Sequence, residues 1–367
     1  MAQERAERHT RPITRNDALH AAPAEGQSVR LKLPELPARL RLAPEYREEL
    51  QRLWYEMLLI RRFEERAAEM YTRARIGGYS HLNIGEEATI VGALTPLRPD
   101  DYVISNYREH GHALVRGVDP KAVMAELFGK ETGCSRGRGG SMHLFDIEKR
   151  FLGGYGIVAG QMPIACGVAM AIQYRRGEEI VVCIFGEGAT NIGAFHESLN
   201  QAKLWHLPVV FLCVNNQYAM GAAVSEDSAV PEIYRKACAY DMRSERVDGM
   251  DVLAVRAVME RAISLAREQH EPSLVEAVTY RFRGHSMADP GRYRTEEEVR
   301  QWMARDPIQT FRRQLEENDL LSASEAQEIE HRVEQIVDEA VRFAEESPAP
   351  DPKDLYKYLY CSWEWGE

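Results

Sequence analysis

The sequence predicts an α/β fold in which a mostly parallel sheet is flanked by helices. Two short segments, residues 180–185 and 209–214, have the length of strands and are apolar on both faces, as buried parallel strands are. Between them, Phe195, Leu199 and Ala202 recur at the spacing of one helix face. A strand, a helix and a second strand in this order form a βαβ unit, and its crossover connection requires parallel strands.

The chain has 367 residues, which exceeds the size at which a single core usually stops growing. We expect one large α/β domain over residues 44–307 and a helical extension with a tail over residues 308–367. Residues 1–43 are polar, Arg-rich and contain proline, and we interpret them as a partly disordered N-terminal arm. A transit peptide is the alternative, but Glu4 and Glu7 argue against it because such peptides are poor in acidic residues.

The composition argues against several classes of protein. A formal net charge of −11 without a basic tract makes binding to nucleic acid or to an anionic membrane unexpected. No apolar segment approaches the length that spans a bilayer. The six cysteines show no Cys-x-x-Cys spacing, so we expect free thiols in a reducing compartment and a cytoplasmic location.

The remaining elements follow from periodicity and from helix start and stop signals. The first helix is expected over residues 44–75, because apolar residues line one side of it and Gly77-Gly78 then stops it. Further elements are expected as strands at 102–105 and 273–280, helices at 161–174 and 252–267, a turn at 247–251 and a loop at 225–228. The C-terminal part forms amphipathic helices, and a capping-box pattern of Ser322 with Glu325 opens the second of them.

A glycine-rich turn joins the strand at 180–185 to the following helix. Such a turn usually binds phosphate, because backbone N–H groups and the helix dipole favour an anion there. Here Glu187 lies between two glycines and Asn191 replaces the third glycine of the dinucleotide-binding fingerprint, so that interpretation fails. A divalent cation between carboxylate and phosphates removes their repulsion, and magnesium is commonly bound in this way. The next strand ends in residues 215–218 (Asn-Asn-Gln-Tyr), whose oxygens are expected at the same edge of the sheet.

An acid in the first glycine turn and an Asn pair at the end of the next strand resemble the metal and diphosphate motif of the thiamine-diphosphate-binding fold. From about residue 55 to about residue 307, the chain resembles the alpha subunit of the thiamine-dependent first component of 2-oxo-acid dehydrogenase complexes, closest to the pyruvate type. The resemblance rests on ordered blocks at residues 81–88, 107–111, 137–143, 154–158 and 284–290. It implies a thiamine-diphosphate-binding α/β fold with a C-terminal helical extension.

The resemblance implies two cofactors, thiamine diphosphate and magnesium. It makes Glu187, Asn216 and the carbonyl oxygen of Tyr218 the magnesium ligands. The residues that it implies for binding the cofactor are Tyr107, Arg108, Gly156, Val158, Glu187, Gly188, Ala189, Asn216 and His285. Without the resemblance, Arg108 would be interpreted as a solvated surface charge, although its planar set of donors matches the oxygens of a diphosphate.

Two histidines are the catalytic residues that the resemblance implies. His81 alone would ordinarily be interpreted as a capped or core histidine. The resemblance instead implies that His81 lies near the substrate, where an imidazole with a near-neutral pKa donates a proton or stabilises a carboxylate. His285 follows the strand at 273–280, where α/β proteins collect catalytic groups, and it is implied to face both cofactor and substrate.

The implied reaction is decarboxylation of pyruvate followed by transfer of the acetyl group to a lipoyl group. The cofactor carries the difficult chemistry. The resemblance covers only the diphosphate-binding half of such an enzyme, and it places the acid that activates the cofactor on a separate beta subunit. The expected partners are this beta subunit, in an α2β2 heterotetramer, and the lipoyl-bearing acyltransferase component.

The substrate is open to alternatives. Residues 284–290 resemble the pyruvate and acetoin branches, whereas Glu187 resembles the branched-chain branch, since relatives of the pyruvate type usually carry Asp there. The alpha subunits of acetoin dehydrogenase and of branched-chain 2-oxo-acid dehydrogenase are therefore alternatives to the pyruvate type. A non-catalytic relative that keeps the fold as an interaction scaffold is a further alternative.

Overall fold

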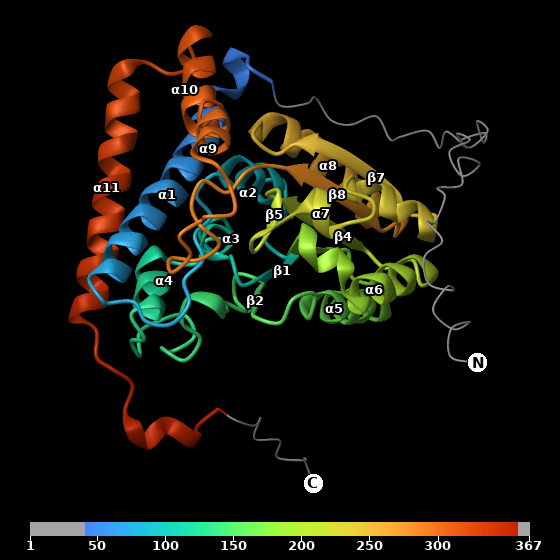
Figure 1. Ribbon diagram of the computed structural model, residues 1–367, viewed down its shortest axis with the longest axis horizontal. Coiled ribbons are helices and arrows are strands. Elements are labelled where there is room, and N and C mark those ends of the chain that lie inside the picture. The colour runs from blue at the N-terminus through green and yellow to red at the C-terminus, as the bar shows by residue number, and fades with distance from the viewer. Residues whose placement is uncertain (1–40, 359–367) are drawn as a thin grey trace, which may run out of the picture. The chain divides into compact units, whose positions relative to one another are not determined.

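The structure is a computed structural model that describes residues 41–358. Most of the predicted arm (residues 1–43) and the end of the predicted tail lie outside these residues. A six-stranded sheet, in which every strand is parallel to its neighbours, forms the centre of the described part in the order β2, β1, β3, β4, β8, β7 (Figure 1). Its strands are β1 (Tyr102–Asn106), β2 (Phe151–Tyr155), β3 (Val181–Gly186), β4 (Val209–Asn215), β7 (Arg243–Asp248) and β8 (Ser273–Val278). The predicted α/β fold with a parallel sheet is confirmed.

The two central strands contribute side chains to two separate cores. On β3, Val182 belongs to one hydrophobic cluster and Cys183 to the other, because successive side chains of a strand point to opposite faces. β4 alternates in the same way and pairs with β3 from Val181 opposite Val209 onward. Both faces of the sheet are covered, which explains why both segments are apolar throughout.

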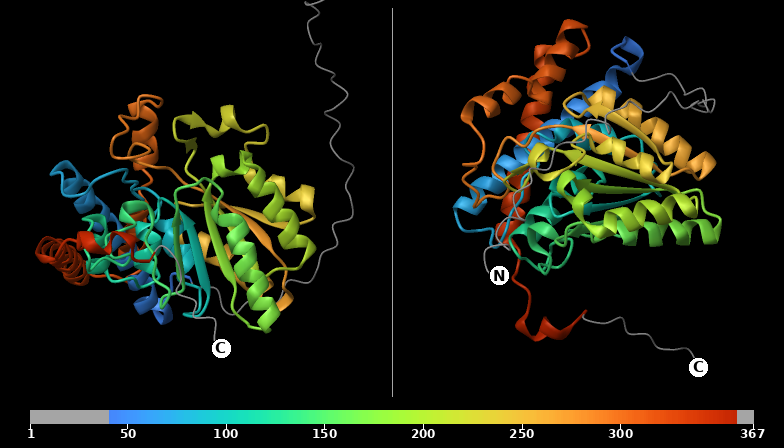
Figure 2. Two further views of the ribbon diagram at one scale, coloured as in Figure 1. Left: turned by 90° about the horizontal axis from the view of Figure 1, so that it is seen from below. Right: turned by 45° about the vertical axis from the view of Figure 1, so that its right-hand side comes forward.

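Helices cover both faces of the sheet (Figures 1 and 2). α5 (Gln161–Arg175) and α6 (Gly193–Leu204) lie side by side on one face, while α2 (Glu87–Leu94) and α8 (Val252–Gln269) cover the other. The first long helix, α1 (Arg47–Thr72), packs against α2 and against the C-terminal helices. The other α-helices of the described residues are α3 (His110–Val115), α4 (Pro120–Leu127), α7 (Val224–Asp227), α9 (Glu296–Met303), α10 (Pro307–Glu317) and α11 (Ala323–Glu346). The division into domains at residue 307 stays a prediction, although α10 and α11 bury residues in the same core as α1.

Side-chain caps fix the starts of several helices. Ser322 and Glu325 form the predicted capping box at the start of α11. Asp306 caps α10, whose first position is Pro307, and Asp251 caps α8. The end of α1 differs from the prediction, since the helix stops at Thr72, before the two glycines. The reason is that the chain turns at Ala74, which adopts a left-handed conformation with a φ of 56°.

Several short elements were missed by the sequence analysis. Residues 225–228 were predicted to be a loop, but most of them form the one-turn helix α7. The glycine-containing strand β2, the charged edge strand β7 and the partly buried helix α9 were not predicted. A two-stranded antiparallel ribbon of β5 (Tyr218–Ala219) and β6 (Ala222–Ala223) was also missed. All of these elements are short or lack a periodic apolar face, so their sequences carry little signal.

The cysteines of the described residues are all free thiols, as predicted, and Cys361 lies outside those residues. Burial raises the pKa of the Cys166 thiol to about 11, so this thiol is protonated at neutral pH. No helix within residues 41–358 combines the length and the apolar character needed to cross a bilayer.

Candidate functional site

The predicted site residues gather at one edge of the sheet, because most of them follow the carboxyl end of a parallel strand. Tyr107 and Arg108 follow β1, Glu187 follows β3, Asn216 follows β4, and His285 lies beyond the end of β8. The carboxyl ends of neighbouring parallel strands meet at the same edge, where α/β proteins bind ligands. The strand order therefore brings together residues that are far apart in the sequence.

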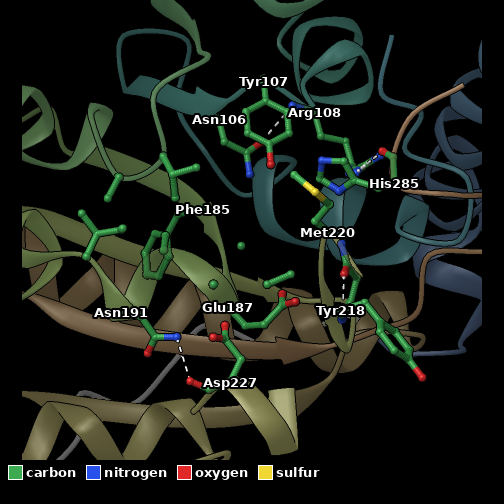
Figure 3. A pocket seen from close by; sticks show the side chains of 18 of the residues that line it. Asn106, Tyr107, Arg108, Phe185, Glu187, Asn191, Tyr218, Met220, Asp227 and His285 are labelled. Atoms are coloured by element: carbon green, nitrogen blue, oxygen red, sulfur yellow. Dashed lines mark hydrogen bonds between the residues drawn. The ribbon is translucent and has the colours of Figure 1, made fainter. Parts of the chain in front are cut away.

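A cavity of about 360 Å³ lies at this edge (Figure 3). The predicted residues that line it are Tyr107, Arg108, Val158, Glu187, Gly188, Ala189, Asn216, Tyr218 and His285. A second cavity of about 750 Å³ adjoins the first, since both are lined by Tyr107, Val158 and His285. The second cavity is also lined by the predicted residues His81 and Gly156. Every predicted site residue thus lies on one of two adjoining cavities.

Glu187 is the central carboxylate of the first cavity. Glu187 is 3% exposed, and its Oε1 has no hydrogen-bond partner among the described residues. Burial raises the pKa of the Glu187 carboxyl to about 7. A buried carboxylate oxygen without a donor is unfavourable, so a cation beside it would satisfy an unmet requirement of the fold.

Two further oxygens lie at the same cavity. The side-chain oxygen of Asn216 and the carbonyl of Tyr218 accept hydrogen bonds from Nη1 of Arg281, at 3.4 and 3.1 Å. Nδ2 of Asn216 donates to Oε1 of Glu86 at 2.8 Å, which fixes the orientation of the amide. Carboxylate, amide and carbonyl oxygens are the ligand types that magnesium prefers.

A metal at this site depends on those oxygens and on the ligand itself. The described residues contain no group of three or more His, Cys, Asp or Glu side chains placed to bind a metal ion. Glu187, Asn216 and the Tyr218 carbonyl fit a magnesium ion whose remaining ligands are phosphate oxygens and water, because magnesium is often held by few protein groups. The residues present therefore fit the predicted magnesium and diphosphate.

The glycine turn after β3 permits close packing on one side and leaves space on the other. A Cβ on Gly188 would lie 2.6 Å from the Cβ of Ala219, so a side chain here would displace β5. A Cβ on Gly186, which lines the first cavity, would meet nothing within 4 Å. The backbone of this turn is thus open to a ligand on the side of the cavity.

Arg108 holds three segments of the chain together. Its Nη1 donates to the carbonyl of Leu82 and its Nη2 to the carbonyl of His285, both at 2.8 Å. Its Nε lies 3.8 Å from the Glu86 carboxylate. These donors position the loops around the cavity, and contact of Arg108 with a diphosphate stays a prediction.

His81, Tyr107 and His285 form a cluster of rings where the two cavities meet. The ring centroid of His81 lies 4.5 Å from that of Tyr107 and 5.0 Å from that of His285. Burial, followed by the charge of Arg108, lowers the pKa of His81 to about 2 and that of His285 to about 3. The expected near-neutral pKa of His81 is therefore wrong for the chain by itself, and both rings are neutral at pH 7. Each Nδ1 is buried without a hydrogen-bond partner in residues 41–358.

Two charged residues of the site were not predicted. Glu86 is 1% exposed and accepts a hydrogen bond from Asn216, and Arg281 is 1% exposed and donates to Tyr218. Glu86 lies in the block at residues 81–88, and Arg281 directly follows the strand predicted at 273–280. A charged loop residue resembles a solvated one until its partners are known, so no signal in the sequence distinguished them.

The chain is similar to known proteins over most of its length. The family described as "Dehydrogenase E1 component" matches residues 55–353. The pyruvate dehydrogenase E1 component subunit alpha of Porphyra purpurea is 46% identical over 316 residues, which are 84% of this chain and 92% of that protein. The protein of the same name from Rickettsia felis is 43% identical over 315 residues, 86% of this chain and 97% of that protein. The chloroplastic alpha-3 subunit of Oryza sativa subsp. japonica is 44% identical over 323 residues, 86% of this chain and 76% of that protein.

Proposed function

The chain belongs to the dehydrogenase E1 component family, and from this premise we propose that it is the alpha subunit of a pyruvate dehydrogenase. It acts as an oxidoreductase on the oxo group of 2-oxo acids. Pyruvate is decarboxylated, and its acetyl group is transferred to a lipoyl group that is reduced in the same step. The main structural support for this proposal is that Glu187, Asn216 and Tyr218 line one cavity at the carboxyl edge of the sheet.

We propose that the first cavity binds thiamine diphosphate together with magnesium. Glu187, Asn216 and the carbonyl of Tyr218 would hold the magnesium ion, and the unpartnered Oε1 of Glu187 supports this role. Gly188 and Ala189 line the same wall, where the backbone lies close to a ligand. When bound, the cofactor supplies a carbon nucleophile that adds to the oxo group of the substrate.

The two histidines contribute as neutral hydrogen-bonding groups. Their pKa values, lowered to about 2 for His81 and to about 3 for His285, mainly by burial, leave neither ring charged at pH 7. Each ring therefore offers one donor and one acceptor nitrogen. Because both rings line the second cavity, we propose that they orient the 2-oxo acid there. Arg108 fixes the loop of His285 by donating to its carbonyl.

We propose that a beta subunit covers the exposed face of α5. Ile164, Gly167, Ala171 and Tyr174 form an exposed apolar stripe on this helix, and Tyr174 is 90% exposed. A surface of this kind marks a site of protein interaction. The same subunit would supply the acid that activates the cofactor, in an α2β2 heterotetramer, and the lipoyl-bearing acyltransferase would be the second partner.

The free thiols of the described cysteines support a reducing compartment, and we propose the cytoplasm. One relative carries the word chloroplastic in its name, so the compartment is a separate question from the activity. Fractionation of cells that express the chain, with detection in each fraction, tests the location.

Steady-state assays of the reconstituted alpha and beta pair test the substrate. We expect a higher specificity constant for pyruvate than for a branched 2-oxo acid or for acetoin. A higher value for the branched acid would favour the branched-chain alternative, and a higher value for acetoin would favour acetoin dehydrogenase. If the pair does not bind thiamine diphosphate in the presence of magnesium, the scaffold alternative is correct.

A further inference from the structure

The side chain of Tyr218 points away from the first cavity, although its carbonyl lies at the proposed metal site (Figure 3). Its hydroxyl donates to the Glu298 carboxylate on α9, at 2.9 Å from Oε1 and 3.0 Å from Oε2. The hydroxyl of Tyr280 donates to Oε1 of the same carboxylate at 3.0 Å. One carboxylate therefore binds two phenols, one from the segment after β4 and one from the segment after β8.

The backbone around Tyr218 requires support from such contacts. Gln217 and Met220 have left-handed conformations, with φ values of 78° and 56°, which non-glycine residues rarely adopt. The ribbon that contains Tyr218 pairs only two residues of β5 with two of β6, and such a small ribbon is not stable by itself. Conformations of this kind persist where surrounding contacts fix them.

α9 provides a fixed point for this contact. Thr295 caps the helix by accepting from the backbone N–H of Glu298 at 3.1 Å. Trp302, at the other end of α9, stacks on Tyr280 with ring centroids 5.1 Å apart and planes 8° from parallel. Tyr280 is fully buried directly after β8, so α9 is attached to the sheet. The position of Glu298 relative to the carboxyl edge of the sheet is thereby set.

We propose that Glu298 is a positioning residue for the magnesium site, because it fixes the phenol of Tyr218 and so holds the Tyr218 carbonyl at the first cavity. Arg281 binds the carbonyl of Tyr218 at 3.1 Å and Glu298 binds its phenol. Both the backbone and the side chain of Tyr218 are therefore fixed. Glu298 lines neither cavity, so its effect on the metal site is indirect and passes through Tyr218. The inference rests on the proposed function, in which the carbonyl of Tyr218 is a magnesium ligand.

The test compares two matched substitutions, Tyr218→Phe and Tyr280→Phe, each of which removes one hydroxyl from the same carboxylate. Glu298→Ala removes the carboxylate itself. Each variant is assembled with the beta subunit and saturating thiamine diphosphate, and Mn²⁺ is titrated as a probe, with free Mn²⁺ measured by electron paramagnetic resonance. We expect Tyr218→Phe and Glu298→Ala to weaken Mn²⁺ binding about tenfold, the loss typical of residues that support a metal ligand, while Tyr280→Phe changes it less than about twofold.

A purely structural role for Glu298, limited to attaching α9, leads to a different result. Both tyrosine variants would then lower the thermal unfolding midpoint alike without changing the affinity for Mn²⁺, and this outcome overturns the proposal. Glu298→Gln keeps one acceptor oxygen of nearly the same position, so it should bind Mn²⁺ more tightly than Glu298→Ala. If Glu298→Ala does not fold, an unchanged affinity in Tyr218→Phe is sufficient to reject the positioning role.

Glu187→Ala separates this inference from the proposed function. If Glu187→Ala loses Mn²⁺ binding while Tyr218→Phe and Glu298→Ala retain it, the metal site is correct and the positioning role is wrong. If Glu187→Ala also binds Mn²⁺ like the unmodified chain, the assignment of the metal site is wrong and the positioning role is rejected with it.

Discussion

Among single residues, Glu187 is the one on which the proposed site depends most. Its carboxyl is buried, and one of its oxygens has no partner among the described residues. An unpaired buried carboxylate is costly, and a bound cation both removes the cost and gains an anionic ligand. The glycines on either side leave the backbone of this turn free of side chains, so the carboxylate and a phosphate have room to share an ion.

Replacing Glu187 by Ala should weaken the magnesium-dependent binding of thiamine diphosphate by at least about 100-fold, since a direct ligand contributes more than the residues that support it. Stability of the fold should change little, because the substitution removes a buried carboxyl of which one oxygen lacks a partner among the described residues. Glu187→Asp should retain binding, because it keeps the carboxylate. The measurement is cofactor affinity as a function of magnesium concentration in the alpha and beta pair.

Glu226→Ala is a suitable control, because Glu226 is an exposed acid on the nearby helix α7. It should leave the magnesium dependence unchanged. If Glu187→Ala binds the cofactor as tightly as the control at every magnesium concentration, Glu187 is not a metal ligand.

His112 gives a prediction about acid stability. It is 2% exposed, and burial lowers its pKa to about 3, so the ring is neutral in the folded chain. The unfolded chain binds a proton near the ordinary pKa of about 6.5, so the stabilisation is complete above that pH and is lost as the pH falls toward about 3. His112 alone should therefore cost about 2 kcal/mol of stability between pH 7 and pH 5.

His112→Phe should remove this acid sensitivity, because Phe fills a similar volume and has no proton to gain. The lost contact with Ser105, 3.2 Å from Nδ1, lowers stability by an amount that does not depend on pH. Urea unfolding of both chains at pH 7 and at pH 5 measures the difference. An equal loss of stability in both chains would contradict the prediction.

The sequence predicted residues whose role follows from their place after a strand, and it missed those whose role follows from a partner. Glu187 and Asn216 could be found because a parallel sheet sends both to the same edge. Glu86 could not be found, because its partner Asn216 lies 130 positions away along the chain and only the folded packing joins them. The pKa of His81 was wrong for the same reason, since burial by distant segments determines it.

Among the elements, length and periodicity decided which ones could be predicted. The strands β3 and β4 and the helices α5, α6 and α8 have apolar patterns long enough to stand out. β7 (RSERVD) is an edge strand in which most residues are charged, and edge strands commonly carry charge. α9 has no fully buried residue and only eight residues, with Val299 and Trp302 packed against the core, so its apolar face is too short to predict a helix.

The capping box of α11 gives a prediction at this scale. The hydroxyl of Ser322 accepts from the backbone N–H of Glu325, and the backbone N–H of Ser322 donates to the Glu325 carboxylate at 2.7 Å. Ser322→Ala should lower stability by about 1 kcal/mol, the typical loss for a helix cap. Ser324→Ala, a change of the same kind in the same exposed turn, should have a much smaller effect. Urea unfolding at pH 7 of the unmodified chain and of both variants measures the difference in stability. Equal stability of the two variants would refute the role of the cap.

At the scale of the whole molecule, the apolar stripe on α5 predicts how the chain assembles. Ala171→Glu places a charge in the middle of this exposed stripe, so it should weaken association with the beta subunit by at least about tenfold. The isolated chain should keep its stability, because Ala171 is exposed. Ala323→Glu, the same substitution at an exposed position on α11, should leave association unchanged. Sedimentation of mixtures with the beta subunit measures the result, and equal association of both variants would show that α5 is not the contact.

The position at which α5 begins predicts that subunit association controls how long the cofactor stays bound. The helix starts at Gln161, only three positions after Val158, and Val158 lines both cavities. If the beta subunit covers α5 as proposed, it also restrains the segment that borders the first cavity, and we expect the cofactor to leave only when the subunits part. The residence time of thiamine diphosphate should then equal the lifetime of the complex between the subunits. Dilution should inactivate the enzyme, because the subunits separate and release the cofactor. Exchange of labelled cofactor, measured alongside exchange of labelled subunits, should give a single shared rate.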